Sequence, residues 1–85
     1  KNKEISFLTG LRIIGLDDVG VIHKITNLIS GELKFNIAAM TIEAKEGIFE
    51  GNVKIYVHDK EELDELVERL IQLPGIERVD RYDTE

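Results

Sequence analysis

Two histidines are the only imidazole side chains of this 85-residue chain, and cysteine is absent. His23 falls on the polar side of a helical pattern and His58 ends a strand-like run. Neither has neighbours in the sequence that would complete a nucleophile, base and orienting group. Without cysteine there is no thiol nucleophile, disulfide or zinc–thiolate site, which fits a reducing cytoplasm. We therefore expect ordinary solvated or capping histidines, no metal site and no cofactor.

A glycine-bounded loop, Gly15–Gly20, has the spacing of the start of a phosphate-binding loop. Val21 and Ile22, however, stand where such a loop needs lysine and a hydroxyl residue, so the phosphate charge and the magnesium ligand are missing. Asp17 and Asp18 alone supply too few oxygens for calcium or magnesium. The remaining interpretation is a turn whose aspartate caps the next helix.

The segment Leu16–Ile22, which we call the corner, could still bind a small molecule. A strand, a turn and a helix follow one another over Leu16–Ile22, and a helix start offers unpaired amides and a positive dipole end. We expect Gly20 to adopt a backbone conformation that other residues resist. Because no deep pocket is evident, a carboxylate ligand would bind between two copies, with this loop facing Asn36 and Ile37 of the other copy. A turn that merely starts a helix is the alternative.

Charge excludes some partners. The formal charge of −6 argues against non-specific binding to nucleic-acid phosphates. No apolar run approaches the roughly 18 residues of a membrane span, and the polar start is not a signal peptide. The later acidic run is either a solvated helix face or a docking surface for a basic partner; its members are Glu61, Glu62, Asp64, Glu65 and Glu68.

The hydrophobic pattern predicts six elements that position these residues. The first three are a strand over Phe7–Leu16, a helix from Gly20 to about Gly31 and a strand over Phe35–Ala44. A turn at Lys45–Gly47 joins the last of these to a strand over Phe49–His58. A helix that is capped by Asp59 and Glu62 and stops at Leu73–Gly75 follows, and a strand over Ile76–Tyr82 ends the domain. We expect tails at residues 1–6 and 83–85 around a single domain, 7–82. The order β-α-β-β-α-β predicts an α+β ferredoxin-like fold, a four-stranded antiparallel sheet with two helices on one face.

Periodicity also predicts the core. The expected helical stripes are Val21, Ile22, Ile25, Leu28, Ile29 and Leu33 in the first helix, and Leu63, Leu66, Val67, Leu70, Ile71 and Leu73 in the second. In the third strand the buried face is Phe49, Gly51, Val53, Ile55 and Val57. In the second strand we prefer Ala38, Met40, Ile42 and Ala44, although Ile37 interrupts the alternation.

Several of these segments, taken together, resemble the ACT domain family of small regulatory modules. The resemblance is carried by Gly15–Ser30, by Asn36-Ile37, by Val57-His58-Asp59 with Leu63, and by Ile76–Arg81, and it covers about Phe7 to Arg81. Within the family, Ile25–Ser30 and Val79-Asp80-Arg81 are most similar to the C-terminal ACT domain of the RelA/SpoT enzymes. Those GTP pyrophosphokinases make and hydrolyse the alarmone (p)ppGpp.

The resemblance implies a non-catalytic regulatory domain of a bifunctional (p)ppGpp synthetase/hydrolase that acts in the stringent response. The Lys at position 1 fits a segment of such a longer protein. In ACT domains an amino acid or another small effector binds between paired copies, which points to Asp17, Asp18, Gly20, Val21 and Ile22, with Asn36 and Ile37 from the opposing copy. The related enzymes usually carry arginine at position 18, where an anion stands here.

Other readings of the same residues stay open. In one alternative the chain is an ACT domain of another amino-acid-regulated protein. In the other it is a dimerisation and docking module that uses an open sheet face with Ile14 and Tyr56. Partners are then a second copy, other domains of the parent chain, or the ribosome and tRNA through Lys54, Arg78 and Arg81. An independent enzyme is the least supported reading.

Overall fold

The computed structural model describes residues 5–82. Its elements are β1 (Phe7–Leu16), α1 (Val19–Thr26), the π-helical turn η1 (Asn27–Glu32), β2 (Asn36–Lys45), β3 (Ile48–Val57), α2 (Lys60–Gln72) and β4 (Ile76–Tyr82). Of the expected tails, residues 1–4 and 83–85 lie outside the described residues, and Ile5 and Ser6 precede β1 without regular structure. The tails and the domain limits therefore stay predictions.

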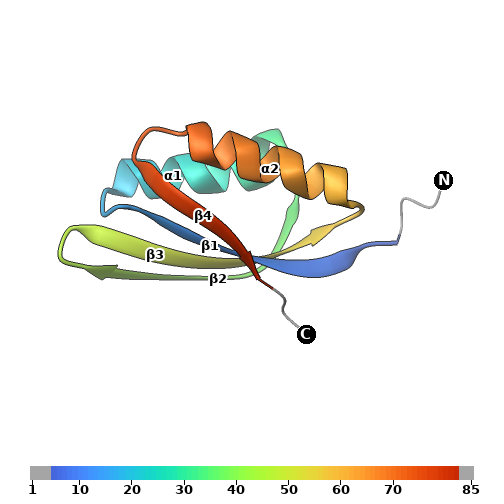
Figure 1. Ribbon diagram of the computed structural model, residues 1–85, viewed down its shortest axis with the longest axis horizontal. Helices are drawn as coiled ribbons and strands as arrows, with labels where there is room; N and C mark the ends of the chain where they lie inside the picture. Colours follow the sequence, from blue (N-terminus) through green and yellow to red (C-terminus); the bar gives the residue numbers. More distant parts are fainter. Residues whose placement is uncertain (1–4, 83–85) are drawn as a thin grey trace.

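The four strands form one antiparallel sheet in the order β2-β3-β1-β4. Both helices cover the same face of this sheet, and the other face is open (Figure 1). The predicted ferredoxin-like fold is confirmed. Strands β1 and β4 have the predicted bounds, whereas β2 and β3 differ from prediction by one residue at each end. Among the described residues, no helix has the length and apolar character of a membrane span.

The core lies between the sheet and the helices, with β3 at its centre. Its buried side chains are Leu11, Ile13, Val21, Ile25, Leu28, Ile29, Phe49, Val53, Ile55, Val57, Leu63, Leu66 and Leu70. The predicted inward face of β3 is confirmed, because each of its five predicted positions is buried. Phe49 is the largest fully buried side chain.

The predicted core set of β2 is largely wrong. A bulge inserts Ala38 between two paired positions, so Ile37 and Met40 both lie on the helix-covered face, where each is half-buried. Ala38 itself is exposed, as are Ile42 and Ala44, although these last two share the face of buried β3 residues. The physical reason is that β2 is an edge strand, and η1 is the part of the helix layer that chiefly contacts it.

The first helix runs through the predicted region but changes its winding. From Asn27 to Glu32 it is π-helical, and the amide of Leu33 donates to the carbonyl of Leu28 at 2.9 Å, five residues back. This wider turn buries both Leu28 and Ile29 against the sheet. Ile22 and Leu33 pack against the core as half-buried residues. The stripe was predictable, but the π turn was not.

The second helix has the predicted cap with one difference. Asp59 Oδ1 accepts from the Glu62 amide at 2.9 Å, but Glu62 Oε1 accepts from the amide of His58 at 2.9 Å rather than from that of Asp59. Leu63, Leu66 and Leu70 are buried, and Val67 and Leu73 are half-buried. Ile71 was expected in the core but is 53% exposed, because it lies at the margin of the buried stripe.

Candidate functional site

The candidate corner lies where β1 ends and α1 begins. Asp18 is the N-cap of α1, and its Oδ1 accepts a hydrogen bond from the Gly20 amide at 2.8 Å. The predicted capping role is confirmed. The expected special backbone of Gly20 is wrong: Gly20 lies in the first turn of α1 and is not among the positive-φ glycines of the described chain, which are Gly47 and Gly75. A helical turn, rather than a strained loop, follows the cap.

Two hydrogen bonds anchor the corner to other parts of the chain. The Leu16 amide donates to the carbonyl of Gly75 at 2.9 Å, and the Asp17 amide donates to the carbonyl of Gly47 at 2.9 Å. Gly75 directly precedes β4, and Gly47 belongs to the β2–β3 hairpin turn. The end of β1 is therefore held from both sides.

Unpaired backbone amides were expected at this corner, but three amides at the start of α1 already donate hydrogen bonds. Besides Gly20, the amides of Val21 and Ile22 both donate to the carbonyl of Asp18, at 2.9 and 3.2 Å. The Asp18 carboxylate itself sits at the helix N-terminus, where a bound anion would gain from the dipole. A single copy therefore presents negative charge here rather than a ready site for a carboxylate.

The apolar side chains of the corner differ in exposure. Val21 is buried, and a Cβ on Gly75 would lie 2.7 Å from its Cγ2, so Val21 serves the core. Ile22 is half-buried. Val19, which the sequence analysis did not single out, is 82% exposed, and Leu16 is 50% exposed. The outward position of Val19 follows from its place just after the cap, a signal that periodicity alone does not give.

The structure does not bring Asn36 and Ile37 to this corner within one copy. Asn36 pairs with Tyr56, and Tyr56 pairs with Leu8 near the start of β1. The corner follows Leu16, at the other end of that strand. Eight strand residues separate the two levels, which is roughly 26 Å. Only a second copy can unite the predicted residues, and this arrangement stays a prediction.

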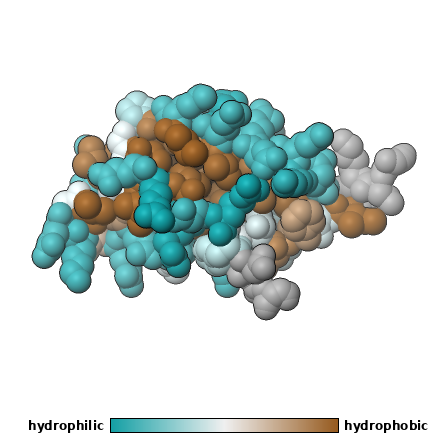
Figure 2. All heavy atoms as spheres, in the orientation of Figure 1, coloured by the Kyte–Doolittle hydropathy of each residue, from teal (hydrophilic) through white to brown (hydrophobic). Residues whose placement is uncertain are grey.

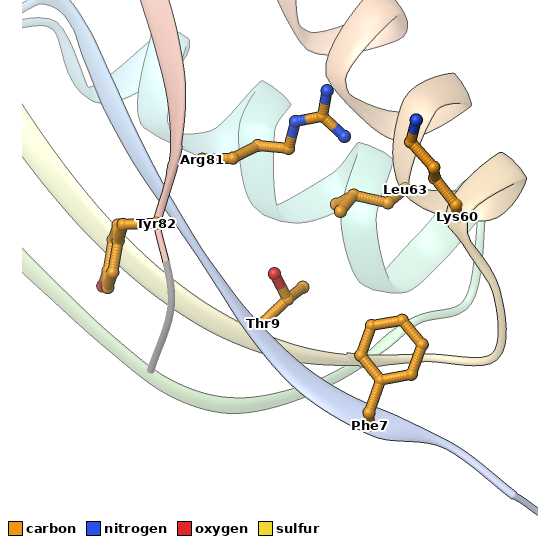
Figure 3. A pocket seen from close by; sticks show the side chains of 6 residues that line it. All are labelled: Phe7, Thr9, Lys60, Leu63, Arg81 and Tyr82. Carbon is orange, nitrogen blue, oxygen red and sulfur yellow. The ribbon is translucent and has the colours of Figure 1, made fainter. Parts of the chain in front are cut away.

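Among the hollows formed by the described residues, two lie away from this corner. One, of about 390 Å³, is lined by Phe7, Thr9, Lys60, Leu63, Arg81 and Tyr82. Figure 3 shows Thr9 and Arg81 pointing to the helix side of the sheet and Tyr82 pointing away from it. The Arg81 guanidinium is 2.9 Å from Asp64 Oδ1, which offsets its charge. The other hollow, of about 280 Å³, lies between the helices, where Arg69 bonds Glu32 at 2.7 Å.

Neither histidine forms a catalytic set within the described residues. His58 Nδ1 is 3.3 Å from Glu62 Oε2, and both side chains are exposed. His23 is exposed on α1, where its carbonyl accepts from the Thr26 hydroxyl at 3.1 Å. Across residues 5–82, no three His, Asp or Glu side chains cluster closely enough to hold a metal ion.

Comparisons with known proteins agree on one family. The family model described as "ACT domain" matches residues 3–81. A crystal structure of the ACT domain from GTP pyrophosphokinase of Chlorobium tepidum is 36% identical, with a TM-score of 0.83, over 92% of this chain and 100% of that one. A solution structure of the same domain is 35% identical, with a TM-score of 0.81, over 94% and 90%.

More distant structures share the fold alone. The C-terminal domain of the MgtC protein from Mycobacterium tuberculosis is 16% identical, with a TM-score of 0.73, over 100% of this chain and 94% of that one. Among curated proteins, no match is found.

Proposed function

This chain belongs to the ACT domain family, and from that membership we propose that it is a non-catalytic regulatory domain of a GTP pyrophosphokinase of the (p)ppGpp synthetase/hydrolase type. The main support is the 36% identity to the Chlorobium tepidum domain across all of that domain. In this role the domain shifts the balance between synthesis and hydrolysis, and an effector acts only through its different affinities for the two states.

The proposed effector is an amino acid held between two copies. The corner of one copy contributes Asp17, Asp18 and Gly20, and the second copy contributes Asn36 and Ile37. Because the Asp18 carboxylate already lies at the start of α1, the ammonium group of the ligand faces the two aspartates. The exposed side chain of Val19 beside them offers apolar contact to the ligand or the second copy.

Isothermal titration of the chain with the twenty amino acids tests this proposal. We expect one of them to bind, and Asp18→Asn to abolish the binding while keeping the fold, since asparagine caps a helix as well as aspartate does. Glu61→Gln removes the same charge from the exposed surface of α2 and should leave binding unchanged. Silence across the whole panel would rule out the amino-acid effector.

A docking role is the second candidate, and the exposed apolar residues at the corner favour it. Val19 and Leu16 are far more exposed than core residues of their type. The open sheet face is mixed in character, because Tyr56 is 43% exposed there while Arg12 and Glu50 form an ion pair of 3.4 Å. Self-association without binding of any amino acid would favour docking over effector sensing.

A ribosome or tRNA contact has limited support from charge. Of the three basic residues expected to make it, Arg78 is paired with Asp80 at 3.0 Å and Arg81 with Asp64 at 2.9 Å. Competing carboxylates weaken binding to phosphate, so such a contact would rest on Lys54 and on other domains of the parent chain. Loss of ribosome binding by the parent protein on Lys54→Glu would test it.

A further inference from the structure

Strand β4 forms one edge of the sheet, next to β1. In Figure 1 it runs diagonally in the foreground, with no element on its outer side. An edge strand presents a row of backbone N–H and C=O groups that can pair with another strand. The charges along β4 indicate which strand that is.

We propose that β4 pairs antiparallel with β4 of a second copy, around a two-fold axis at Val79. The central residues of the strand read Glu77-Arg78-Val79-Asp80-Arg81. In this register each Arg78 lies opposite Asp80 of the second copy. The pairing rests on these two residues, because Glu77 is the extra residue of a bulge in β4 and Arg81 is held by Asp64 of α2 at 2.9 Å. Arg78 and Asp80 then each face a residue of opposite sign, and opposite charges across an antiparallel pair are stabilising.

Neighbouring registers are disfavoured by the same residues. A shift by one position in one direction places Arg78 opposite Arg81. A shift by two positions places Arg78 opposite its own counterpart, or Asp80 opposite its own. Each of these arrangements sets like charges directly against one another, which is destabilising. The charges of Arg78 and Asp80 thus favour the pairing centred on Val79.

The central charges already have a suitable arrangement in one copy. Arg78 Nε and Asp80 Oδ2 are 3.0 Å apart. Both side chains lie on the open face of the sheet, because Asp80 pairs with Arg12 and Arg78 with Ile14, on the side opposite the buried residues. The side chain of Arg78 is 69% exposed and that of Asp80 is 39% exposed. Pairing two copies joins two such ion pairs into a square of alternating charges.

On the helix side, an apolar surface borders the same edge. Figure 2 shows hydrophobic residues gathered between the C-terminal half of α2 and β4. Ile71 is 53% exposed, and the half-buried members of this surface are Val67, Leu73, Ile76 and Val79. A second copy joined along β4 would bring its own α2 alongside and cover them. This interface is separate from the proposed effector site, which uses β2 of the second copy.

Analytical ultracentrifugation of charge-reversed variants tests the pairing. We expect the wild-type chain to dimerise, and Arg78→Glu or Asp80→Arg alone to raise the dimer dissociation constant at least about tenfold, because each sets like charges opposite one another. An equimolar mixture of the two variants should dimerise again, since Glu then faces Arg and Asp faces Arg across the two strands. Lys24→Glu makes the same charge change on α1 as Arg78→Glu makes on β4, and it should leave dimerisation unchanged.

Crosslinking provides a second measurement that does not depend on charge reversal. The chain has no cysteine, so Val79→Cys introduces a single thiol at the axis. Mild oxidation should link two copies through it faster than through Lys24→Cys. Circular dichroism checks that each variant is folded.

Three results would overturn the proposal: a monomeric wild-type chain, a mixture that fails to restore dimers, or equal crosslinking at positions 79 and 24. A dimer insensitive to Arg78 and Asp80 would point to another surface. The proposed effector binding is tested by titration and does not depend on any of these results.

Discussion

The carboxylate of Asp18 accepts a hydrogen bond of 2.8 Å from the amide of Gly20 and thereby closes the first turn of α1. Loss of a cap of this kind costs about 1 kcal/mol. We therefore predict that Asp18→Ala lowers the free energy of unfolding by about 1 kcal/mol. Asp17→Ala is the matched control: the described residues give the Asp17 side chain no hydrogen bond or ion pair, so a change within about 0.5 kcal/mol is expected. Urea denaturation at one fixed protein concentration measures both, and equal effects would contradict the prediction.

Two glycines lie on either side of the Phe49 ring, and they should respond differently to alanine. A Cβ on Gly15 would lie 2.7 Å from the Gly75 carbonyl oxygen and 2.9 Å from Phe49 Cε2. A Cβ on Gly51 would have its nearest contact at 3.4 Å. Gly15→Ala should cost about 1–3 kcal/mol of stability through overpacking. Gly51→Ala should cost less than about 0.5 kcal/mol, as a change that meets ordinary contacts does. Thermal unfolding followed by circular dichroism distinguishes the two.

The turn of the β2–β3 hairpin holds Glu46 in a strained backbone conformation, which a substitution should relieve. Glu46 and Gly47 have φ values of 55° and 85°, so both central residues of the turn are left-handed. Asparagine before glycine suits such a turn far better than glutamate. Glu46→Asn should raise the free energy of unfolding by about 0.5–1 kcal/mol. Gly47→Ala should lower it, since alanine would be strained there even though no atom lies within 4 Å of the new Cβ. Guanidinium titration measures the difference, and equal stability of the two variants would contradict it.

Leu66 and Ile71 separate the buried side of α2 from its margin. Leu66 is fully buried, whereas Ile71 is 53% exposed. Leu66→Ala should therefore cost about 2–5 kcal/mol through lost burial and the cavity it leaves. Ile71→Ala should cost less than about 1 kcal/mol in the monomer. Calorimetry at low protein concentration, where association is minimal, compares them. A larger loss at position 71 would mean that α2 is rotated from the described orientation.

Much of the fold could be predicted from the sequence because two periods dominate it. Alternation in Phe49–Val57 and helical spacing around Leu63, Leu66 and Leu70 each place one face in the core, and both were confirmed. The failures occur where a local change alters the period. The bulge at Ala38 shifts the alternation of β2 by one residue. The π turn adds a residue to the helix near Leu28. Both depend on tertiary packing, which one sequence does not display.

The corner was predicted less completely. The cap at Asp18 follows from residue type and position, and it was confirmed. The backbone of Gly20 could not be inferred, because glycine tolerates both a helix and a left-handed turn. The partners of Leu16 and Asp17 come from residues far along the chain, and no local pattern predicts such contacts. The pairing of the corner with Asn36 and Ile37 stays a prediction.

The backbone hydrogen bonds of Leu16 and Asp17 make the corner a junction of the sheet. One runs to the residue that leads into β4 and the other to the turn that ends β2, so the corner is tied to both outer strands of the sheet. Asp17 is bonded to Gly47 at the β2 edge, and Leu16 is bonded to Gly75 at the β4 edge. The corner therefore joins the two opposite borders of the sheet through two adjacent residues, and the loss of either hydrogen bond would detach one border from it.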